Sequence, residues 1–538
     1  SQISNTGTVY ALARGRPQGP ICYHSGTRIR RKSPMAHAFA SPSTELPLAR
    51  LAEMRAHGGP AQTVGLTDKV IGEFLEEDPR LALAIERAYA HFLELKESHA
   101  DFLALAEADQ VAHAQEGLTN FYAKDVVNPY VAAGAAGPWV VSLKGAVIYD
   151  CGGYGMLGLG HAPEAVAQAM DQPHVMANVM TPSVSQIEFI ESLRKEIGHT
   201  REGGTPFVSF LCLNSGSEAM TVASRIADAN TKKLTDPGAR YEGCEVRGLT
   251  LKGSFHGRTD RPARFSNSSR KTYTKHLASY SDCDYLLTVE PNDVEALEAV
   301  FAEAEKEGVF IEAFFMEPVM GEGNPGLAIE PAFYARAREL TLEHGTMFVV
   351  DSIQAGLRAR GVLSIVDYPG FETLAEPDME SYSKALNAGQ FPLSVLALSK
   401  KAAETHRAGL YGNTMTTNPR ALDIAVAVLD SFTPERRQNI RKRGQELVER
   451  LGGLADATNG GVTGAQGTGL LLSCELHARY KVYGANSTEE YLRKHGLGVI
   501  HGGEHSLRYT PVFDIGAKEV DLIVELTRDA LLHGPVEG

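Results

Sequence analysis

The sequence predicts an α/β protein with a large domain built on a mainly parallel sheet, a smaller α/β domain at the C-terminus and a helical extension at the N-terminus. From about residue 195, short apolar runs alternate with helical stretches, which is typical of a parallel sheet with helices on both faces. From about residue 435, helices accompany only a few strands. Between about 45 and 125, apolar residues recur at helical spacing, which indicates helices packed on the main body.

The predicted strands are short apolar runs that end at polar residues or glycine. In the large domain these runs lie at 207–213, 249–251, 310–316, 346–350 and 394–398. In the smaller domain they lie at 470–476 and 507–510. Helical stretches, such as 331–344, separate them and complete the alternating pattern.

The extension shows its helical pattern most clearly after Asp78. Asp78 followed by Pro79 is typical of an N-cap and the first position of a helix. The apolar residues that recur behind this pair are Leu81, Ile85, Ala88, Phe92 and Leu95. Because a stripe of Leu and Phe is typical of core packing, we assign no chemistry to the extension.

These changes of pattern divide the chain into five segments. They are a basic leader at 1–44, the helical extension at 45–125, an N-terminal part of the small domain with a linker at 126–195, the large domain at 196–430 and the C-terminal small domain at 431–538. The leader has six basic residues and no Asp or Glu, which is typical of an organellar transit peptide. It is equally compatible with upstream sequence ahead of a start at Met35.

Composition excludes several classes of protein. The chain has 538 residues, 43% hydrophobic and 22% charged, ordinary values for a protein long enough to bury a large core. Its net charge of -14 repels nucleic acid, and no run approaches the length of a membrane span. The cysteines show no metal-ligand spacing, so we expect no metal and reduced thiols in the cytoplasm, or in an organellar matrix if the leader is a transit peptide. They are Cys22, Cys151, Cys212, Cys244, Cys283 and Cys474.

Ligands of open parallel sheets bind beyond the carboxyl ends of the strands, so we expect site residues directly after the apolar runs. Asn214, Ser215, Gly216 and Ser217 follow the run at 207–213 and open a helix. Free backbone N–H groups and the positive end of the helix dipole favour a phosphate group there. The alternative is an ordinary strand-to-helix turn with Ser217 as the N-cap.

Phe255 and His256 follow the run at 249–251. An aromatic ring in this place suits the face of a flat ligand. A single Phe or His is more often part of the core, so this pair is weak evidence by itself.

Asp351 directly ends the run at 346–350, and Gln354 follows three residues later. A buried aspartate is costly unless it meets a cation, and a protonated pyridine nitrogen is such a cation. A charge-assisted hydrogen bond of roughly 1.5–3 kcal/mol outweighs the roughly 1.36 kcal/mol that one pKa unit requires. The alternative is an N-cap aspartate for the next segment.

Lys384 lies among small and apolar residues, which makes it a candidate for a Schiff-base amine. Burial lowers the pKa of a lysine and frees the nucleophile. Lys400 and Lys401 also follow an apolar run and compete by spacing alone, but we interpret them as a solvated pair that opens a helix. The order and separation of the four candidate segments are more informative than any one of them.

From about residue 125 to the C-terminus, about three quarters of its length, the chain resembles the class III aminotransferases of fold type I, such as ornithine, lysine-ε and GABA aminotransferases. The segments that carry this resemblance are Gly160-His161-Ala162-Pro163, Ser215-Gly216-Ser217-Glu218-Ala219, Phe255-His256-Gly257, Glu317-Pro318-Val319-Met320-Gly321-Glu322-Gly323, Asp351 with Gln354, Lys384, the segment 412–419 and Leu507-Arg508-Tyr509-Thr510-Pro511.

The resemblance implies pyridoxal 5'-phosphate as the cofactor, with Lys384 and Asp351 as the catalytic residues. The residues implied to bind the cofactor are Ser215, Gly216 and Ser217 at its phosphate, Phe255 and His256 at its pyridine face, Asp351 and Gln354 at the ring nitrogen and phenolic oxygen, Lys384 as the Schiff base, and Thr414 at the phosphate held by the neighbouring subunit.

The resemblance also implies a substrate pocket formed by Tyr154, Glu322 and Arg508. Arg508 would bind the carboxylate of a 2-oxo acid. Glu322 would pair with Arg508 when the substrate presents no carboxylate there, so that the two residues form a switchable ion pair. The alternative is a structural loop carboxylate at Glu322 and a surface charge at Arg508.

Three positions depart from the pattern of the family. Ser352 replaces a Glu, Ser383 replaces the Gly before the lysine, and Ala388 replaces the first of two glycines. None of these changes removes a catalytic atom, but they leave the subfamily and the substrate open.

The resemblance implies an aminotransferase that moves an amino group from an amine or ω-amino acid to a 2-oxo acid such as 2-oxoglutarate, and a homodimer with shared active sites. Other pyridoxal-phosphate reactions, by an aminomutase, a racemase or a phospho-lyase, are the alternative on the same fold. A non-catalytic binding relative is the alternative from another class, and the intact Lys384, Asp351 and Gln354 argue against it.

Overall fold

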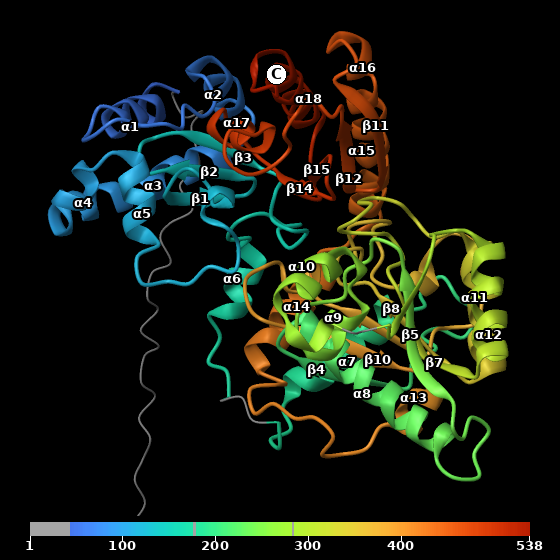
Figure 1. The fold of residues 1–538 in the computed structure, drawn as a ribbon. Coiled ribbons are helices and arrows are strands. Elements are labelled where there is room, and N and C mark those ends of the chain that lie inside the picture. The colour runs from blue at the N-terminus through green and yellow to red at the C-terminus, as the bar shows by residue number, and fades with distance from the viewer. Residues whose placement is uncertain (1–43, 176–178, 282–283, 538) are drawn as a thin grey trace, which may run out of the picture. The chain divides into compact units, whose positions relative to one another are not determined.

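The computed structural model describes residues 44–175, 179–281 and 284–537 (Figure 1). The described residues belong to one compact unit. Apart from Thr44, the predicted basic leader lies outside the described residues.

The large sheet has seven strands in the order β4-β10-β9-β8-β7-β5-β6. β10 runs antiparallel to both of its neighbours, and the pairs from β9 to β6 are all parallel. The prediction of a mainly parallel sheet is therefore confirmed. The strands are β4 (Ser209–Leu213), β5 (Glu245–Leu251), β6 (Leu286–Val289), β7 (Val309–Met316), β8 (Met347–Asp351), β9 (Met379–Tyr382) and β10 (Ser394–Leu398).

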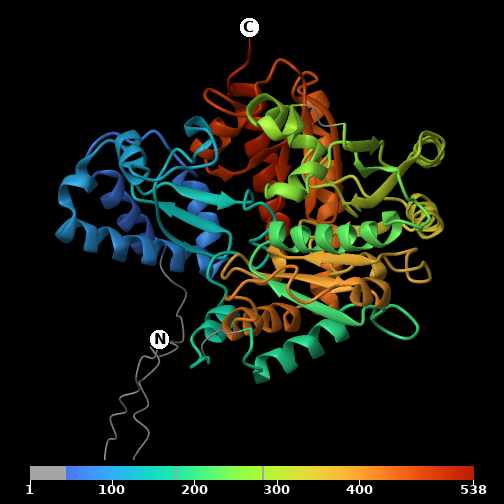
Figure 2. The same ribbon diagram turned by 60° about the horizontal axis from the view of Figure 1, so that its bottom comes forward.

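Alternate residues of the central strands face opposite layers of helices, as the two-residue period of a strand requires. Phe314 and Phe348 pack with Tyr334 of α12 in one cluster, whereas Phe315 packs with Ala223 of α8 in another. Figure 1 shows α11 and α12 side by side next to β5 and β7, and Figure 2 shows α8 along the sheet. The covering helices are α8 (Gly216–Thr235), α11 (Val294–Glu307) and α12 (Pro331–His344).

Two strands of the large sheet, β6 and β9, lie outside the apolar runs that we predicted as strands. The apolar pattern of the sequence does not reveal β9, because this strand carries Glu380 and Ser381, which are both fully buried. Glu380 is tolerated there because it accepts hydrogen bonds from the hydroxyl of Ser352 at 2.5 Å, the hydroxyl of Ser364 and the amide of Ile365 at 2.9 Å. The hydrogen bond with Ser352 also explains how a serine is accommodated where the family has Glu.

The extension is helical, as predicted, and α3 packs on the sheet formed by β1, β2, β3 and β13. Asp78 is the N-cap of α3, and it also accepts a hydrogen bond of 2.7 Å from the indole of Trp139 on β2. The cap therefore joins the extension to the sheet. The elements are α1 (Glu45–Arg55), α2 (Asp68–Leu75), α3 (Pro79–Ser98), α4 (Ala100–Ala104), α5 (Glu107–Ala114), η1 (Lys124–Val126), β1 (Ala132–Ala136), β2 (Trp139–Ser142) and β3 (Val147–Asp150).

The C-terminal segment forms a second small sheet, in the order β11-β12-β15-β14, and also completes the N-terminal one. β13 pairs parallel with β3, so residues far apart in the chain share one sheet. The elements are α14 (Pro419–Asp430), α15 (Pro434–Gly452), α16 (Leu454–Ala457), β11 (Val462–Thr468), β12 (Leu471–Leu476), α17 (Thr488–Lys494), β13 (Leu497–Gly498), β14 (Ile500–Gly502), β15 (Ser506–Tyr509) and α18 (Ala517–His533).

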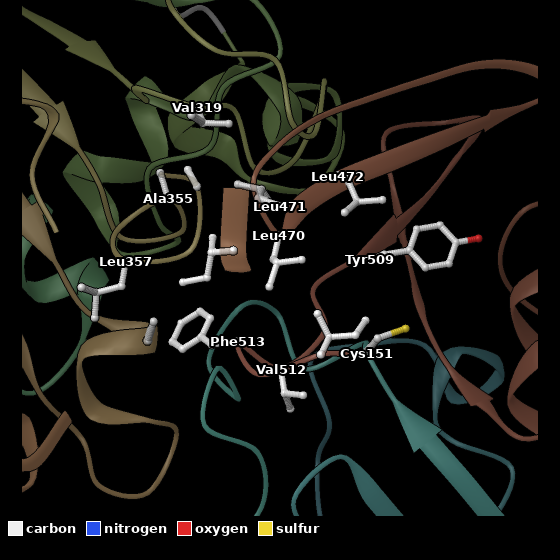
Figure 3. Packing of buried hydrophobic residues seen from close by; sticks show 14 of the residues in the cluster. Cys151, Val319, Ala355, Leu357, Leu470, Leu471, Leu472, Tyr509, Val512 and Phe513 are labelled. Atoms are coloured by element: carbon white, nitrogen blue, oxygen red, sulfur yellow. The ribbon is translucent and has the colours of Figure 1, made fainter. Parts of the chain in front are cut away.

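A continuous apolar core joins the segment after Asp351 to this C-terminal region. Ala355 and Leu357 lie in one buried cluster with Leu470, Leu471 and Phe513 (Figure 3). The shared packing holds the end of the large sheet against the small sheet.

Shorter elements connect these regions. They are α6 (Glu164–Met170), α7 (Val184–Glu196), α9 (Asp260–Phe265), η2 (Asn267–Ser269), α10 (Arg270–His276), η3 (Ala278–Tyr280), η4 (Ile365–Asp367), η5 (Lys384–Asn387) and α13 (Lys400–Thr405). Within the described ranges, no helix has the length and apolar character needed to cross a membrane. No set of three or more His, Cys, Asp or Glu side chains in this part of the chain is placed to hold a metal ion.

Candidate active site

A cavity of about 400 Å³ opens where β8 and β9 end and α8 begins. It collects side chains from segments that are far apart in the sequence, as expected at the carboxyl edge of a parallel sheet. The predicted site residues that line it are Ser215, Gly216, Ser217, Phe255, His256, Asp351, Gln354 and Lys384.

Lys384 lies two residues after the end of β9 and adopts a left-handed backbone conformation, with φ 43°. Such a conformation is strained for a residue other than glycine. The turn is held by Ser383 and Asn387, whose side chains donate to the carbonyl of Leu393 at 2.7 and 3.0 Å. Burial, assisted by the Arg508 guanidinium, lowers the pKa of Lys384 to about 8, so roughly a tenth of the amine is neutral and nucleophilic at pH 7.

The two competing lysines lie outside this cavity. Lys400 and Lys401 open α13, as predicted, and Lys401 lies 3.5 Å from the carboxylate of Asp378. Neither residue lines the cavity, so Lys384 is the lysine that the geometry favours as the nucleophile.

Asp351 is only 5% exposed, and both of its oxygens have partners. Oδ2 lies 2.9 Å from Nδ1 of His256. Oδ1 accepts hydrogen bonds of 3.2 Å from the hydroxyl of Ser381 and from the amide of Ile353. These partners orient the carboxylate in the wall of the cavity, where it can meet a cationic ring nitrogen.

The N-terminus of α8 forms an open cradle for an anion. Ser215 is the N-cap and accepts a 3.3 Å hydrogen bond from the amide of Glu218. The alternative in which Ser217 caps the helix is therefore wrong, and the hydroxyl of Ser217 points instead toward the segment of Gly257. A Cβ on Gly257 would lie 2.6 Å from that hydroxyl, and its φ of +112° also requires glycine.

Glu317 is a site residue that could be recognised from the sequence only as a member of a motif. It lines the cavity and is 2% exposed. Its two oxygens accept hydrogen bonds of 3.0 Å from the amides of Phe255 and Gly321, so it joins the aromatic segment to the Gly-Glu-Gly loop. Burial raises the pKa of Glu317 to about 7.

Arg508 is 1% exposed, so the alternative of a surface charge is wrong. Its Nη1 donates to Oε2 of Glu322 at 3.0 Å, to Oε1 of Gln354 at 3.3 Å and to the carbonyl of Gly321. Its Nε is buried without a partner among the described residues. The guanidinium carbon also lies 5.6 Å from the ring centre of Tyr154, so the predicted substrate residues lie together.

Arg258 and Tyr122 are two further residues that the sequence did not single out. Arg258 is exposed, and its guanidinium lies 5.1 Å from the ring centre of Phe255. Tyr122 stacks on Tyr154. Thr414, by contrast, is exposed and does not line the cavity of its own chain.

The residues present fit pyridoxal phosphate. The cradle at Ser215–Ser217 suits its phosphate, the buried Asp351 suits its ring nitrogen, and the amine of Lys384 opens into the same cavity.

Comparison with known proteins agrees with this geometry. Residues 121–531 match the family Aminotransferase class-III. The chain belongs to the class-III aminotransferase family. It is therefore a transaminase that depends on pyridoxal phosphate, with the fold type I architecture that the resemblance implied.

Named relatives are ornithine and acetylornithine aminotransferases. The chain is 29% identical to ornithine aminotransferase 2 of Staphylococcus aureus over 76% of its own length and 97% of that protein. It is 30% identical to acetylornithine aminotransferase of Neisseria meningitidis over 71% of its own length and 90% of that protein. The solved ornithine aminotransferase of Toxoplasma gondii superposes with a TM-score of 0.66 at 23% identity, covering 81% of this chain and 98% of that one.

Proposed function

We propose that this aminotransferase moves the terminal amino group of an ω-amino acid of the ornithine class onto a 2-oxo acid such as 2-oxoglutarate. The observation that carries the proposal is the ion pair of Arg508 and Glu322, 3.0 Å apart beside Lys384. The relatives named for ornithine and acetylornithine support the class of donor.

The pair allows one pocket to accept two different substrates. A 2-oxo acid carries a carboxylate next to the reacting carbon, whereas the terminal amine of an ω-amino acid carries none there. With Glu322 paired to it, Arg508 presents no free charge to the donor. When the acceptor binds, its carboxylate takes the place of Glu322, which is 29% exposed and can move toward solvent.

A second carboxylate contact fits the far end of the donor. Arg258 lies over Phe255 at the rim of the cavity. No carboxylate among the described residues lies within ion-pair distance of it. The remote carboxylate of an ω-amino acid suits this cation, which orients the chain of the donor with its amine toward Lys384.

When bound, pyridoxal phosphate withdraws electrons from the carbon that carries the amine of the donor. Lys384 is the residue placed to remove the proton from that carbon and to return it. Asp351 would accept a hydrogen bond from the protonated ring nitrogen, and His256 and Ser381 hold Asp351 in place. Glu317 accepts hydrogen bonds from the amides of Phe255 and Gly321 and so holds both segments in position at the cavity.

A homodimer with shared sites belongs to the same proposal. Thr414 is exposed and does not line the active-site cavity of its own chain, which suits a role at the phosphate held by a second copy. Apolar side chains that are at least half exposed also suit burial in such an interface. They are Val175, Val179, Val184, Ile187 and Met415. The free thiols of Cys151, Cys212, Cys244 and Cys474 support the cytoplasm as the location.

A screen of amine donors against 2-oxo acids tests the proposal. The holoenzyme is mixed with ornithine, acetylornithine, 4-aminobutyrate or alanine, and each with 2-oxoglutarate or pyruvate. We expect glutamate to form from 2-oxoglutarate in equal amount to the aldehyde formed from ornithine. Conversion of a donor without consumption of any 2-oxo acid would instead indicate an aminomutase, racemase or phospho-lyase.

A further inference from the structure

The carboxylate of Glu380 is fully buried on β9, the strand that leads to Lys384. Its three hydrogen-bond donors are neutral: the hydroxyl of Ser352 at 2.5 Å, the hydroxyl of Ser364 and the amide of Ile365 at 2.9 Å. No Lys, Arg or His side chain among the described residues lies within ion-pair distance of it, and burial raises its pKa to about 7. Because a buried carboxylate without a cation is costly, core packing alone does not account for a glutamate here.

The hydrogen bond from Ser352 joins β9 to the turn that follows β8. The amide of Ser352 also donates to the carbonyl of Ser381 at 3.0 Å, so its backbone and its side chain are both held by β9. The carbonyl of Ser352 accepts a hydrogen bond of 2.8 Å from the amide of Gly356, which closes the turn over residues 352–356. A Cβ on Gly356 would lie only 2.8 Å from the same carbonyl, so this turn is tightly packed.

The same turn carries Gln354, which lines the cavity. Oε1 of Gln354 accepts a hydrogen bond of 3.3 Å from Nη1 of Arg508. On its other side the amide group is covered by Gly321, where any Cβ would overlap it. Because Gln354 has so little room, a displacement of the turn would be passed directly to Arg508.

The two faces of β9 hold different parts of the site. Successive side chains of a strand point to opposite faces. Ser381 donates to Oδ1 of Asp351 at 3.2 Å on one face, and Glu380 holds Ser352 on the other. Glu380 therefore belongs to the framework that fixes Asp351 and Gln354 relative to the strand of Lys384.

Position 352, where the family pattern has Glu, is occupied here by the serine that contacts Glu380. Val350 is paired with Glu380 across the two strands, and residue 352 follows two positions later, toward the same face. The contact of 2.5 Å between Ser352 and Glu380 shows that side chains from these two positions meet. Two carboxylates so close together could not both ionise without a large penalty, so a serine at 352 and a glutamate at 380 suit one another.

We propose that Glu380 supplies from β9 the buried carboxylate that the family carries at position 352, and that it acts through Ser352 as a positioning residue for Gln354 and Arg508. This goes beyond the proposed function, because it concerns the framework of the site and not the choice of substrate. Glu380 does not line the cavity, so it touches neither cofactor nor substrate. Its removal leaves buried donors without an acceptor, and the turn that carries Gln354 loses its attachment.

An exchange of the two side chains tests the proposal. Glu380→Ser removes the acceptor, Ser352→Glu places two carboxylates together, and the double variant has one carboxylate and one hydroxyl again. We titrate each cofactor-free protein with pyridoxal phosphate and follow the absorbance. We expect each single variant to bind the cofactor roughly tenfold or more weakly, because a hydrogen bond to a charged group is lost. The double variant is expected to bind within about threefold of the unmodified protein.

Two further variants separate positioning from general stability. Asp378→Asn is the matched control, because Asp378 is another fully buried carboxylate next to β9, paired with Arg338 at 3.1 Å and away from the cavity. We expect it to unfold at a lower urea concentration with unchanged affinity for pyridoxal phosphate. Glu380→Gln keeps an oxygen that can accept from Ser352, so we expect it to retain most of the affinity.

The kinetics of the holoenzyme give a second readout. In Glu380→Ser we expect KM for 2-oxoglutarate to rise by a larger factor than kcat falls, because Gln354 no longer holds Arg508 in place. Asp378→Asn is expected to leave KM unchanged. If 2-oxoglutarate is not used at all, the proposed acceptor is wrong, but the cofactor titrations still decide the role of Glu380.

The double variant decides the outcome even if a single variant does not fold. A folded double variant beside an unfolded Glu380→Ser supports the proposal, because the second change has then restored the lost contact. A double variant that does not fold, or that binds the cofactor no better than the weaker single variant, overturns it. Equal loss of cofactor affinity in Glu380→Ser and Asp378→Asn overturns it as well.

Discussion

Nδ1 of His256 lies 2.9 Å from Oδ2 of Asp351, and the two side chains are 2% and 5% exposed. The same imidazole places Nε2 at 3.1 Å from the hydroxyl of Thr250. His256, which is held by Thr250, therefore holds the buried carboxylate of Asp351 in place. Because a buried carboxylate that loses a partner is poorly solvated, His256 controls how well Asp351 serves a cationic ring.

The first prediction is that His256→Leu weakens cofactor binding by roughly 10- to 100-fold. A hydrogen bond to a charged group contributes roughly 1.5–3 kcal/mol. The measurement is a titration of the cofactor-free protein with pyridoxal phosphate, followed by absorbance. His161→Leu is the control, because His161 lies at 3.0 Å from Asp150 and does not line the cavity. Equal losses of cofactor affinity in both variants would show that the contact between His256 and Asp351 has no special role.

The second prediction concerns Lys384 and pH. The pKa of its amine is lowered from 10.5 to about 8, so below pH 8 the folded, cofactor-free protein carries a cation that the unfolded chain solvates better. This penalty is lost as the pH rises from about 8 to 10.5. We expect cofactor-free Lys384→Met to be more stable than the unmodified protein at pH 7 by roughly 1–3 kcal/mol, with a smaller gain at pH 9.5.

Urea unfolding at both pH values measures this difference in the free energy of unfolding. Lys401→Met is the control, because Lys401 lies outside the cavity and near the carboxylate of Asp378. It is expected to give no gain at pH 7. A Lys384→Met protein that is less stable than the unmodified one at pH 7 would contradict the prediction.

The third prediction separates the two half-reactions. Arg508→Ala removes the partner of the acceptor carboxylate, a loss on the order of 2–5 kcal/mol, so the half-reaction with 2-oxoglutarate slows by roughly 30-fold or more. The half-reaction with ornithine changes much less. Glu322→Ala has the opposite effect, because the free arginine then favours α-amino acids as donors.

Stopped-flow absorbance of each half-reaction measures these rates. Arg436→Ala is the matched control, because Arg436 forms an ion pair of 2.8 Å with Asp514 away from the cavity. Equal slowing of both half-reactions in Arg508→Ala would rule the switch out.

The fourth prediction uses mixed dimers. If Thr414 completes the site of the partner, a dimer of one Lys384→Ala subunit and one Thr414→Ala subunit has one doubly damaged site and one intact site. We expect purified mixed dimers to be more active than either homodimer. If Thr414 acts within its own chain, the mixed dimer has at most half of the activity of the Thr414→Ala homodimer.

The predictable part of the site consists of residues that directly follow apolar strands. Asp351 and the segment from Ser215 to Ser217 stand at strand ends, where the edge of a parallel sheet gathers ligands. Their contribution could be inferred from position and residue type. Lys384 follows β9, a strand that the apolar pattern does not reveal, and its assignment depended on the resemblance and on the small residues around it.

The remaining site residues could not be predicted because their roles depend on contacts across the fold. Tyr122 lies at the end of an extension whose apolar stripe gives no sign of the active site. Nothing in the sequence distinguishes Arg258 from other basic residues, and its proposed role depends on its position over Phe255. Glu380 breaks the pattern of a buried strand, and it is tolerated because the hydroxyls of Ser352 and Ser364 and the amide of Ile365 donate to it.

The parallel pairing of β13 with β3 has a consequence for how the protein folds during translation. Strands β1, β2 and β3 are synthesised before the strands of the large sheet, but their fourth strand, β13, is synthesised only after them. Until then β3 presents an open edge, to which another nascent chain could add. The extension helix α3 is synthesised before these strands and packs on β1 and β2. Helix α3 is therefore available to cover the apolar face of the incomplete sheet while the rest of the chain is synthesised.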